Sequence, residues 1–331
     1  MSATSHPDTE PGAGPDVSVV MPVLNESRHL REAVGRVLAQ DLDGALELVL
    51  ALGPSNDDTD DVAAELAAAD PRVRLVPNPS GRTPDGLNAA VAASSHPVIA
   101  RVDGHAVLPP GYLRTAIAVL EQTGADNVGG IMDARGITDI ERAIAAAMRS
   151  RLGVGSARFH TGGGAGPAET VYLGVFRRAA LDRVGGYDEH FARAQDWEMN
   201  HRIRATGGTV WFTPELRVTY RPRADLPALA RQYFQYGRWR RVVARRHPGT
   251  MSARYLAPPL LVVGLAATVV VSPWLPVVLV VPAGYAAALV LGSCTIEKDL
   301  APRSRAVLPV VLAVMHLSWG VGFLTSRVGE P

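Results

Sequence analysis

The alternation of apolar runs with amphipathic segments in the first 123 residues is the strongest constraint on the fold of this chain. Apolar runs of strand length lie at 17–23, 46–52, 73–76 and 98–102. Helical patterns lie at 26–40, 57–69, 83–93 and 112–123. Strands that alternate with helices at this spacing form a parallel sheet with right-handed crossovers. The sequence therefore predicts a doubly wound, mostly parallel α/β domain, whose ligands bind beyond the carboxyl ends of the strands.

The last third of the chain is almost free of charge. Its apolar segments lie at 256–271, 274–291 and 307–324, and a helix needs about 20 apolar residues, or about 17 at least, to cross a bilayer. The first two segments are short and contain prolines, so a re-entrant hairpin or a soluble helical hairpin is an alternative to two crossings. Basic residues crowd between Arg217 and Arg254, as in a cytoplasmic juxtamembrane stretch. We expect two or three membrane helices within 256–325.

Composition excludes several further classes of protein. The chain has 331 residues and a formal net charge of +1, so it offers no basic field for nucleic acid. Its single cysteine, Cys294, rules out an intrachain disulfide and a cysteine-based zinc site. Residues 1–16 are polar and lack an apolar run, which predicts a disordered tail without a cleavable signal. We expect one large domain at 17–250.

Polar residues after the first two strands form a candidate nucleotide site. Pro22 ends the first strand, and the turn after it carries Asn25 and Glu26. A helix N-terminus favours an anionic or polar ligand, and Glu26 can accept hydrogen bonds from a nucleobase or ribose. The alternative is a capping turn with Asn25 or Ser27 as N-cap. In the acidic stretch after the second strand, Asp57 is expected to face the base, although helix capping also explains such a stretch.

A candidate metal site follows the fourth strand. Asp103 and His105 alternate in an extended segment with Gly104 between them, so both can point toward one divalent ion that bridges two phosphates. A carboxylate suits Mg²⁺ or Mn²⁺, and an imidazole shifts the balance toward Mn²⁺. Taken alone, Asp-x-His is also common in ordinary loops, but its place at a strand end favours the metal site.

A candidate general base lies in the second half of the chain. Asp196 follows Gln195 at the start of a helical pattern at 197–205, where a partly desolvated carboxylate can accept a proton. Helix capping by Asp196 is the alternative, and Glu198 is expected on the solvated face. The glycine-rich stretch at 161–166 is interpreted as a flexible loop over an active site, with an ordinary surface loop as the alternative.

The last motif lies within a helical pattern at 233–246. Gln235 and Arg238 share a helix face, and Arg238 can form two hydrogen bonds to a phosphate. The indole of Trp239 offers a stacking surface for a sugar or base. An amphipathic interfacial helix with Trp and Arg anchors is the structural alternative, and both can hold together.

In their order, these motifs resemble the family 2 inverting glycosyltransferases of the GT-A fold, particularly the succinoglycan and exopolysaccharide type, over roughly 17–246. The resemblance implies that the nucleotide sugar is held by Pro22, Asn25, Glu26, Asp57 and Asp103. It implies Mg²⁺ or Mn²⁺ at Asp103 and His105, and Asp196 as catalytic base. It also implies contacts to the acceptor and diphosphate from Gln195, Gln235, Arg238 and Trp239.

The chain departs from the family pattern at two positions. The strand that usually ends in a base-contacting Asp ends here in Leu52, so base recognition is expected to rest on Glu26 and Asp57. His105 replaces the second carboxylate of the metal motif, which leaves Asp103 as the principal ligand.

The resemblance implies a membrane-anchored, metal-dependent hexosyltransferase in the plasma membrane with a cytoplasmic catalytic domain. It is expected to move a sugar from a nucleotide-diphosphate sugar, a UDP-sugar first, to a glycan or lipid-linked acceptor in exopolysaccharide or cell-envelope glycan synthesis. The alternatives are a polyprenyl-phosphate glycosyltransferase and a nonenzymatic membrane assembly component with a nucleotide-binding domain. A nucleotidyltransferase would need a glycine-rich basic loop after the first strand, which 22–26 does not provide.

Overall fold

A computed structural model of the chain describes residues 14–327, so most of the predicted tail at 1–16 lies outside the described residues. The chain forms two compact units that interleave along the sequence. The first unit holds residues up to Gly130, Leu173–Tyr187 and Met199–Leu216. The second holds Ile131–Tyr172, Asp188–Glu198 and the residues from Arg217 onward. The predicted domain boundary near residue 250 stays a prediction, because the second unit combines segments from both sides of it.

The first unit is built on parallel strands in the order β3-β2-β1-β4. These strands are β1 (Val17–Val23), β2 (Leu46–Leu52), β3 (Val73–Pro77) and β4 (Val98–Arg101). Val17, Val19 and Val20 are fully buried, as expected for a parallel strand with both faces covered. Beyond β4 the sheet becomes mixed, since β7 (Tyr172–Arg177) pairs with β4 in the antiparallel direction. The predicted mostly parallel α/β fold is confirmed.

The remaining strands continue the sheet from β7. The full order is β3-β2-β1-β4-β7-β5-β8-β6, with β5 (Asn127–Ala134), β8 (Val210–Tyr220) and β6 (Gly166–Pro167). By their residue ranges, β5 and β8 begin in the first unit and end in the second. Gly130 allows β5 to approach β8 closely, because a Cβ atom there would lie 1.9 Å from the Leu216 carbonyl oxygen.

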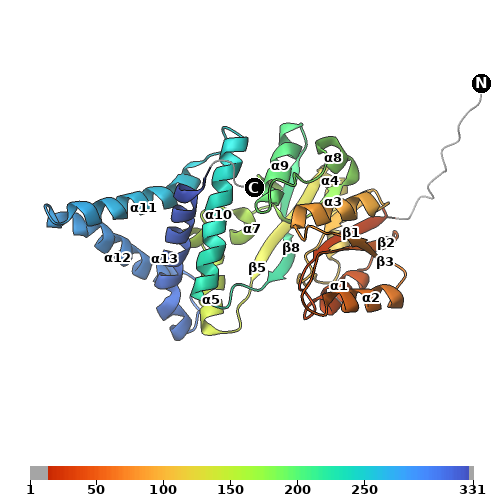
Figure 1. Ribbon diagram of the computed structural model, residues 1–331, viewed down its shortest axis with the longest axis horizontal. Coiled ribbons are helices and arrows are strands. Elements are labelled where there is room, and N and C mark those ends of the chain that lie inside the picture. Colours follow the sequence, from red (N-terminus) through yellow and green to blue (C-terminus); the bar gives the residue numbers. More distant parts are fainter. Residues whose placement is uncertain (1–13, 328–331) are drawn as a thin grey trace, which may run out of the picture. The chain divides into compact units, whose positions relative to one another are not determined.

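The helices predicted for the first unit form as α1 (Leu30–Leu38), α2 (Thr59–Ala69), α3 (Thr83–Ala93) and α4 (Tyr112–Thr123). Helix α8 (Arg178–Val184) also belongs to this unit and was not predicted. In Figure 1, α1 and α2 lie side by side, and α3 packs on β1 and β2. The predicted helix at 26–40 begins only at Leu30, because the amide groups of His29 and Leu30 both donate to the Glu26 carbonyl and close a turn there.

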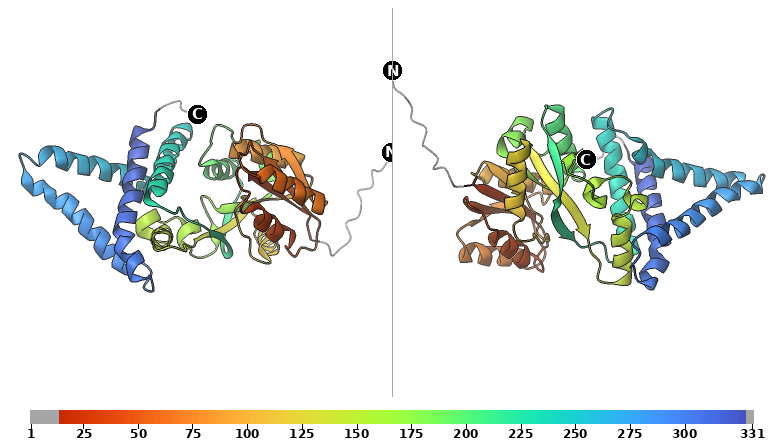
Figure 2. Two further views of the ribbon diagram at one scale, coloured as in Figure 1. Left: turned by 60° about the horizontal axis from the view of Figure 1, so that its bottom comes forward. Right: turned by 180° about the vertical axis from the view of Figure 1, so that it is seen from behind.

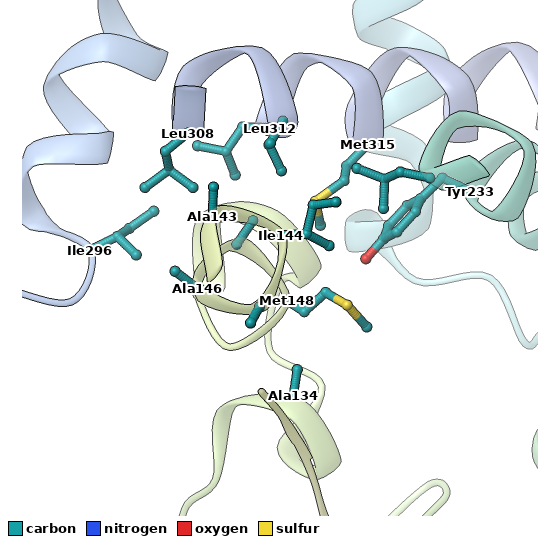
Figure 3. Packing of buried hydrophobic residues seen from close by; sticks show 14 of the residues in the cluster. Ala134, Ala143, Ile144, Ala146, Met148, Tyr233, Ile296, Leu308, Leu312 and Met315 are labelled. Atoms are coloured by element: carbon teal, nitrogen blue, oxygen red, sulfur yellow. The ribbon is translucent and has the colours of Figure 1, made fainter. Parts of the chain in front are cut away.

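The second unit is mostly helical. Its elements include α5 (Asp139–Met148), α6 (Arg151–Val154), α7 (Arg158–Thr161), α10 (Leu226–Arg246), α11 (Ala253–Val271), the 3-10 turn η1 (Pro276–Leu279), α12 (Val280–Thr295) and α13 (Pro302–Thr325). Helix α9 (Gln195–Ala205) begins in this unit and ends in the first. Figure 3 shows Leu308, Leu312 and Met315 of α13 facing Ala143 and Ile144 of α5 in a buried apolar cluster.

Glycines bring α10 and α13 into backbone contact. A Cβ atom on Gly237 would lie 2.0 Å from the Trp319 carbonyl oxygen, and one on Gly322 would lie 2.0 Å from the Phe234 carbonyl oxygen. Small residues allow this close approach, which is common between helices in membranes. The motif helix α10 is therefore fixed directly to the last apolar helix of the chain.

In the part of the chain that the structure describes, three helices are long and apolar enough to cross a membrane: Ala253–Val271, Pro276–Thr295 and Pro302–Thr325. Only 11% of the most apolar window of each of the first two is buried, against 33% for the third. Trp274, a large hydrophobic residue between the first two of these helices, is 79% exposed. In Figures 1 and 2, α11 and α12 meet near η1 and diverge toward α13. Three C-terminal apolar helices are thus confirmed, whereas their crossings remain a prediction.

Candidate active site

The loops after β1 and β2 are joined by side-chain hydrogen bonds. Asn25 adopts a left-handed backbone conformation, with φ 56°. Its amide donates to Ser55 Oγ at 3.1 Å, and its side-chain Oδ1 accepts from the Asn56 amide at 2.7 Å. The Glu26 amide donates to Thr59 Oγ1 at 2.8 Å. The predicted nucleotide residues Asn25 and Glu26 therefore lie in a loop that the neighbouring loop holds in place.

Asp57 is the main link between these two loops. Its Oδ2 accepts from the Ser27 amide at 3.3 Å and from Ser27 Oγ at 2.7 Å, while Oδ1 accepts from the Thr59 amide at 3.2 Å. Hydrogen bonds from Thr59 and Ser27 lower the pKa of the Asp57 carboxyl to about 2. The carboxylate is therefore ionised at neutral pH and shapes the loop, and its predicted contact with a base stays a prediction.

The expected cap of α1 is absent. His29 precedes the helix and makes no side-chain cap hydrogen bond, so neither Asn25 nor Ser27 is the N-cap. Pro22 pairs with Ala51 of β2, whereas the pairing of β1 with β4 ends at Val20. A proline without an N–H is tolerated there, because β1 has lost one of its neighbours.

Asp103 lies in a turn directly after β4. Arg101, which is buried, donates from Nε at 3.2 Å and from Nη2 at 3.0 Å to Asp103 Oδ1. The Val102 amide donates to the Val20 carbonyl at 3.1 Å, and the Ala106 amide donates to the Asp103 carbonyl at 2.8 Å. The carboxylate is thus fixed at the carboxyl end of β4, where ligands bind in sheets of this kind.

His105 pairs with Glu26 across the same end of the sheet. Nδ1 of His105 lies 2.7 Å from Glu26 Oε1. Gly104 makes this approach possible, since a Cβ atom there would lie 3.0 Å from Glu26 Cγ. A metal-binding histidine typically donates one ring N–H to a carboxylate, which orients the other nitrogen toward the metal. Glu26 therefore contacts the predicted metal motif, a contact that the sequence did not indicate.

The donor set fits a divalent ion that a substrate helps to bind. Within residues 14–327, no cluster of three or more His, Cys, Asp or Glu side chains forms a metal site. Asp103 and His105 supply one carboxylate and one imidazole. Mg²⁺ is commonly held by one or two carboxylates together with substrate phosphates and water. These residues suit an ion shared with a diphosphate, and they do not suit an ion enclosed by protein alone.

Asp196 lies in the first turn of α9. The helix begins at Gln195, after Ala194 in a left-handed conformation with φ 61°. The Glu198 amide donates to the Ala194 carbonyl at 3.0 Å. Asp196 is therefore a helical residue and not the cap that precedes the helix. The positive end of the helix dipole favours its carboxylate.

Glu198 corrects one expectation. The sequence predicted a solvated position, but the side chain is only 1% exposed. Its Oε1 lies 3.0 Å from Nε2 of His247, which stacks on Phe191 with ring centroids 6.3 Å apart. A buried carboxylate needs such a partner. Because His247 lies 49 residues away, no local pattern in the sequence reveals the pair.

Trp239 is a core residue of the second unit. It is 8% exposed and packs with Phe191 and Val243, with 6.2 Å between the Phe191 and Trp239 ring centroids. This burial argues against the predicted stacking surface for a sugar or base. Gln235 and Arg238 are partly buried on the same helix, and the Arg238 carbonyl accepts from Ser326 Oγ at 3.2 Å. The sequence missed Trp239 as a core residue because its partner Phe191 lies in another segment.

The glycine-rich stretch at 161–166 wraps around Arg158. The guanidinium donates to the carbonyl oxygens of Gly164 at 3.1 Å and Pro167 at 2.8 Å. Gly162 and Gly163 both have positive φ, which glycine adopts without strain. The stretch is thus an organised turn, and its predicted position over an active site stays a prediction.

Comparisons with known proteins agree with these motifs. The family model described as "Glycosyl transferase family 2" matches residues 18–185. The succinoglycan biosynthesis protein ExoA of Rhizobium meliloti is 32% identical over 310 residues, which cover 92% of this chain and 93% of ExoA. Glycosyltransferase AglE of Haloferax volcanii is 23% identical over 230 residues, which cover 68% of this chain and 72% of AglE.

Solved structures share the fold. Mannosyltransferase PcManGT from Pyrobaculum calidifontis, in complex with GDP-Man and Mn²⁺, superposes with a TM-score of 0.65 at 19% identity, covering 96% of this chain and 89% of PcManGT. TarS 1–349 from S. aureus in complex with UDP gives a TM-score of 0.53 at 14% identity, covering 95% and 92% of the two chains. The family match, the full-length relative and the strand-end motifs together show that this chain is a glycosyltransferase of family 2 with the GT-A fold.

Proposed function

We propose that this glycosyltransferase moves a sugar, with inversion, from a nucleotide-diphosphate sugar to a glycan or lipid-linked acceptor in exopolysaccharide or cell-envelope glycan synthesis. The observation that carries the proposal is the turn of Asp103, Gly104 and His105, held at the end of β4 by Arg101 and Glu26. The name of the relative ExoA and the GDP-Man, Mn²⁺ and UDP in the related structures support the proposal.

The loops after β1, β2 and β4 bind the donor in this proposal. Pro22 and Asn25 shape the loop after β1, and Asp57 keeps that loop joined to the loop after β2. Glu26 orients His105, and Asp103 with His105 would hold Mg²⁺ or Mn²⁺. Such an ion supplies positive charge that stabilises the departing diphosphate. We propose a UDP-sugar as the first donor to test.

The proposed general base is Asp196. Asp196 accepts the proton of an acceptor hydroxyl, whose oxygen attacks the anomeric carbon from the side opposite the leaving group. The bond from the anomeric carbon to the diphosphate breaks, so a nucleoside diphosphate leaves and the configuration inverts. Gln195 and Gln235 position the acceptor, and Arg238 pairs with the diphosphate. Trp239 contributes by packing α10 onto Phe191.

The apolar helices support a membrane location. Within residues 14–327, three helices are long and apolar enough to span a membrane, and basic residues precede the first. We propose a multi-pass plasma-membrane protein with its catalytic domain in the cytoplasm, because basic flanks face that side. A membrane location concentrates the enzyme near a lipid-linked acceptor.

Product analysis with radiolabelled donors tests the function. Membranes from cells that produce the wild-type chain and the Asp196→Asn variant are incubated with labelled UDP-glucose, UDP-galactose and GDP-mannose, each with Mg²⁺ or Mn²⁺. We expect label in the lipid or polymer fraction for one donor, only with wild type. Label on a lipid as a single phosphate-linked sugar would instead indicate a polyprenyl-phosphate glycosyltransferase. Label in neither fraction would contradict the proposal.

A further inference from the structure

Arg240 is an almost fully buried cation in the second unit. It is 6% exposed and follows Trp239 in α10. Its guanidinium carbon lies 4.3 Å from the ring centroid of Trp197 and 4.0 Å from that of Tyr255. Nη2 donates to the Thr250 carbonyl. Arg240 thus connects the first turn of α9 with the first turn of α11.

The other N–H groups of this guanidinium are not satisfied. Within residues 14–327, Nε and Nη1 of Arg240 are buried and have no hydrogen-bond partner. Cation–π contacts favour the positive charge but do not accept these N–H groups. A buried donor without an acceptor is rare and unfavourable. An anion with several oxygen atoms matches these donors better than any neutral group, since arginine forms its strongest hydrogen bonds with phosphate and carboxylate.

The side chain of Ser252 is a second indication of an anion site near Arg240. Ser252 is the N-cap residue of α11, yet its side chain makes no cap hydrogen bond. Its Oγ is also buried without a partner in the described part of the chain. The first amide groups of a helix and the positive end of its dipole favour an anion. Arg240, bonded to Thr250 two residues before Ser252, brings its charge to this helix start.

The residues near Arg240 favour a lipid over a free anion as the ligand. α11 is a candidate membrane span, and Leu260 and Val263 on it are exposed apolar residues. A ligand with an anionic head and an apolar tail would satisfy Arg240 and also cover this apolar surface. Glu169, whose charge acts on Arg240, is already paired with Arg254.

We propose that Arg240, Ser252 and the N-terminal turn of α11 bind the phosphate or diphosphate of a lipid that carries the acceptor sugar. The inference rests on the proposed function and names its acceptor class. Trp197, which contacts Arg240, directly follows Asp196 in α9. A phosphate held at Arg240 therefore keeps the attached sugar near the proposed base.

Equilibrium binding to the full-length protein in detergent tests the site. Isothermal titration uses farnesyl diphosphate as the lipid probe, inorganic pyrophosphate as the free anion and farnesol as the neutral lipid. We expect farnesyl diphosphate to bind more tightly than pyrophosphate and farnesol not to bind measurably. Arg240→Gln should weaken farnesyl diphosphate binding by about tenfold or more, because a charge-assisted hydrogen bond is lost.

Two further variants supply a control and an independent test of the site. Arg246→Gln removes an exposed cation from the same helix and should leave the affinity unchanged. Ser252→Ala removes only a hydroxyl and should weaken binding by about two- to tenfold without changing the melting temperature. If Arg240→Gln fails to fold, the farnesyl diphosphate affinity of Ser252→Ala therefore tests the proposed site.

Specific outcomes overturn the inference. The inference is wrong if Ser252→Ala binds farnesyl diphosphate as tightly as wild type, and if Arg240→Gln, provided that it folds, does so too. The guanidinium of Arg240 would then have only a structural role. Equal affinity for pyrophosphate and farnesyl diphosphate would assign the site to a free diphosphate. Asp196→Asn should bind farnesyl diphosphate normally while it loses transfer. A wild-type enzyme that transfers sugar but does not bind farnesyl diphosphate would retain the proposed function and lose this site.

Discussion

The two units bury apolar side chains against different partners. In the first unit, the aliphatic residues of β1 and β2 are covered by the chain itself, and Val19 and Leu48 are fully buried. In the second unit, the first two candidate spans keep only 11% of their most apolar windows buried. The same residue types therefore complete the core of the first unit and stay exposed on two candidate spans of the second, where their surface suits an apolar phase such as a membrane.

The units also differ in how they hold the proposed site residues. Hydrogen bonds and an ion pair between polar side chains fix Asp57, Asp103 and His105 in the first unit. Helix packing fixes the second unit, through Gly237 against α13 and Trp239 against Phe191. Substitutions of polar loop residues and substitutions at packed helix positions should therefore have different effects on the protein.

Asp196→Asn should have the largest effect on activity. Loss of a general base lowers transfer by about 10²- to 10⁴-fold, whereas donor affinity should not change, because Asp196 is not one of the proposed donor-binding residues. Initial rates with labelled donor and titration of the donor separate the two quantities. Glu215→Gln, on an exposed residue of β8, serves as the control. Full turnover in Asp196→Asn would reject Asp196 as the general base.

Glu26→Gln and His105→Ala should weaken metal binding in the first unit. Because the Glu26 carboxylate faces Nδ1 of His105 at 2.7 Å, either change should reduce Mn²⁺ affinity by about 10- to 100-fold. Electron paramagnetic resonance of free Mn²⁺ in the presence of UDP measures this affinity directly. His29→Ala alters a histidine of the same loop outside the pair and should have no effect. Unchanged Mn²⁺ affinity in both variants would reject the pair as a metal-orienting device.

Gly237→Ala should destabilise the second unit by about 1–3 kcal/mol, because overpacking forces the backbone to shift. The added Cβ atom would lie 2.0 Å from the Trp319 carbonyl oxygen. Thermal unfolding in detergent, followed by tryptophan fluorescence, gives the change. Gly264→Ala in α11 is the matched control, since nothing lies within 4 Å of its Cβ position. Equal melting temperatures for the two variants would show that α10 and α13 do not depend on close backbone contact.

Glu47 gives the first unit a smaller, pH-dependent contribution. Burial alone would raise the pKa of its carboxyl, but hydrogen bonds from Ser18, Ser95 and Arg74 lower it from 4.5 to about 2. A folded-state pKa below the unfolded value stabilises the fold above pH 4.5, and this stabilisation is lost as the pH falls toward about 2. Glu47→Gln should flatten the melting-temperature profile in that window. Glu32→Gln, at an exposed position of α1, should leave the profile unchanged.

Local patterns predicted the elements well. The bounds of β1, β2, α3 and α4 match the predicted ranges at both ends, because each is a short stretch of uniform periodicity between turn residues. The start of α1 was wrong by four residues, since the turn after β1 uses the Glu26 carbonyl and interrupts the helical pattern. Apolar length alone likewise identified the three C-terminal helices.

The sequence by itself determined the α/β order, the strand-end position of Asp103 and the apolar helices, because these depend on neighbours along the chain. Only the tertiary structure decided that Glu26 faces His105, that Glu198 is buried against His247 and that Arg240 lies on Trp197 and Tyr255. Each of these partners is separated by many residues in the sequence. Side-chain burial and pairing over such separations follow from packing, which local periodicity does not encode.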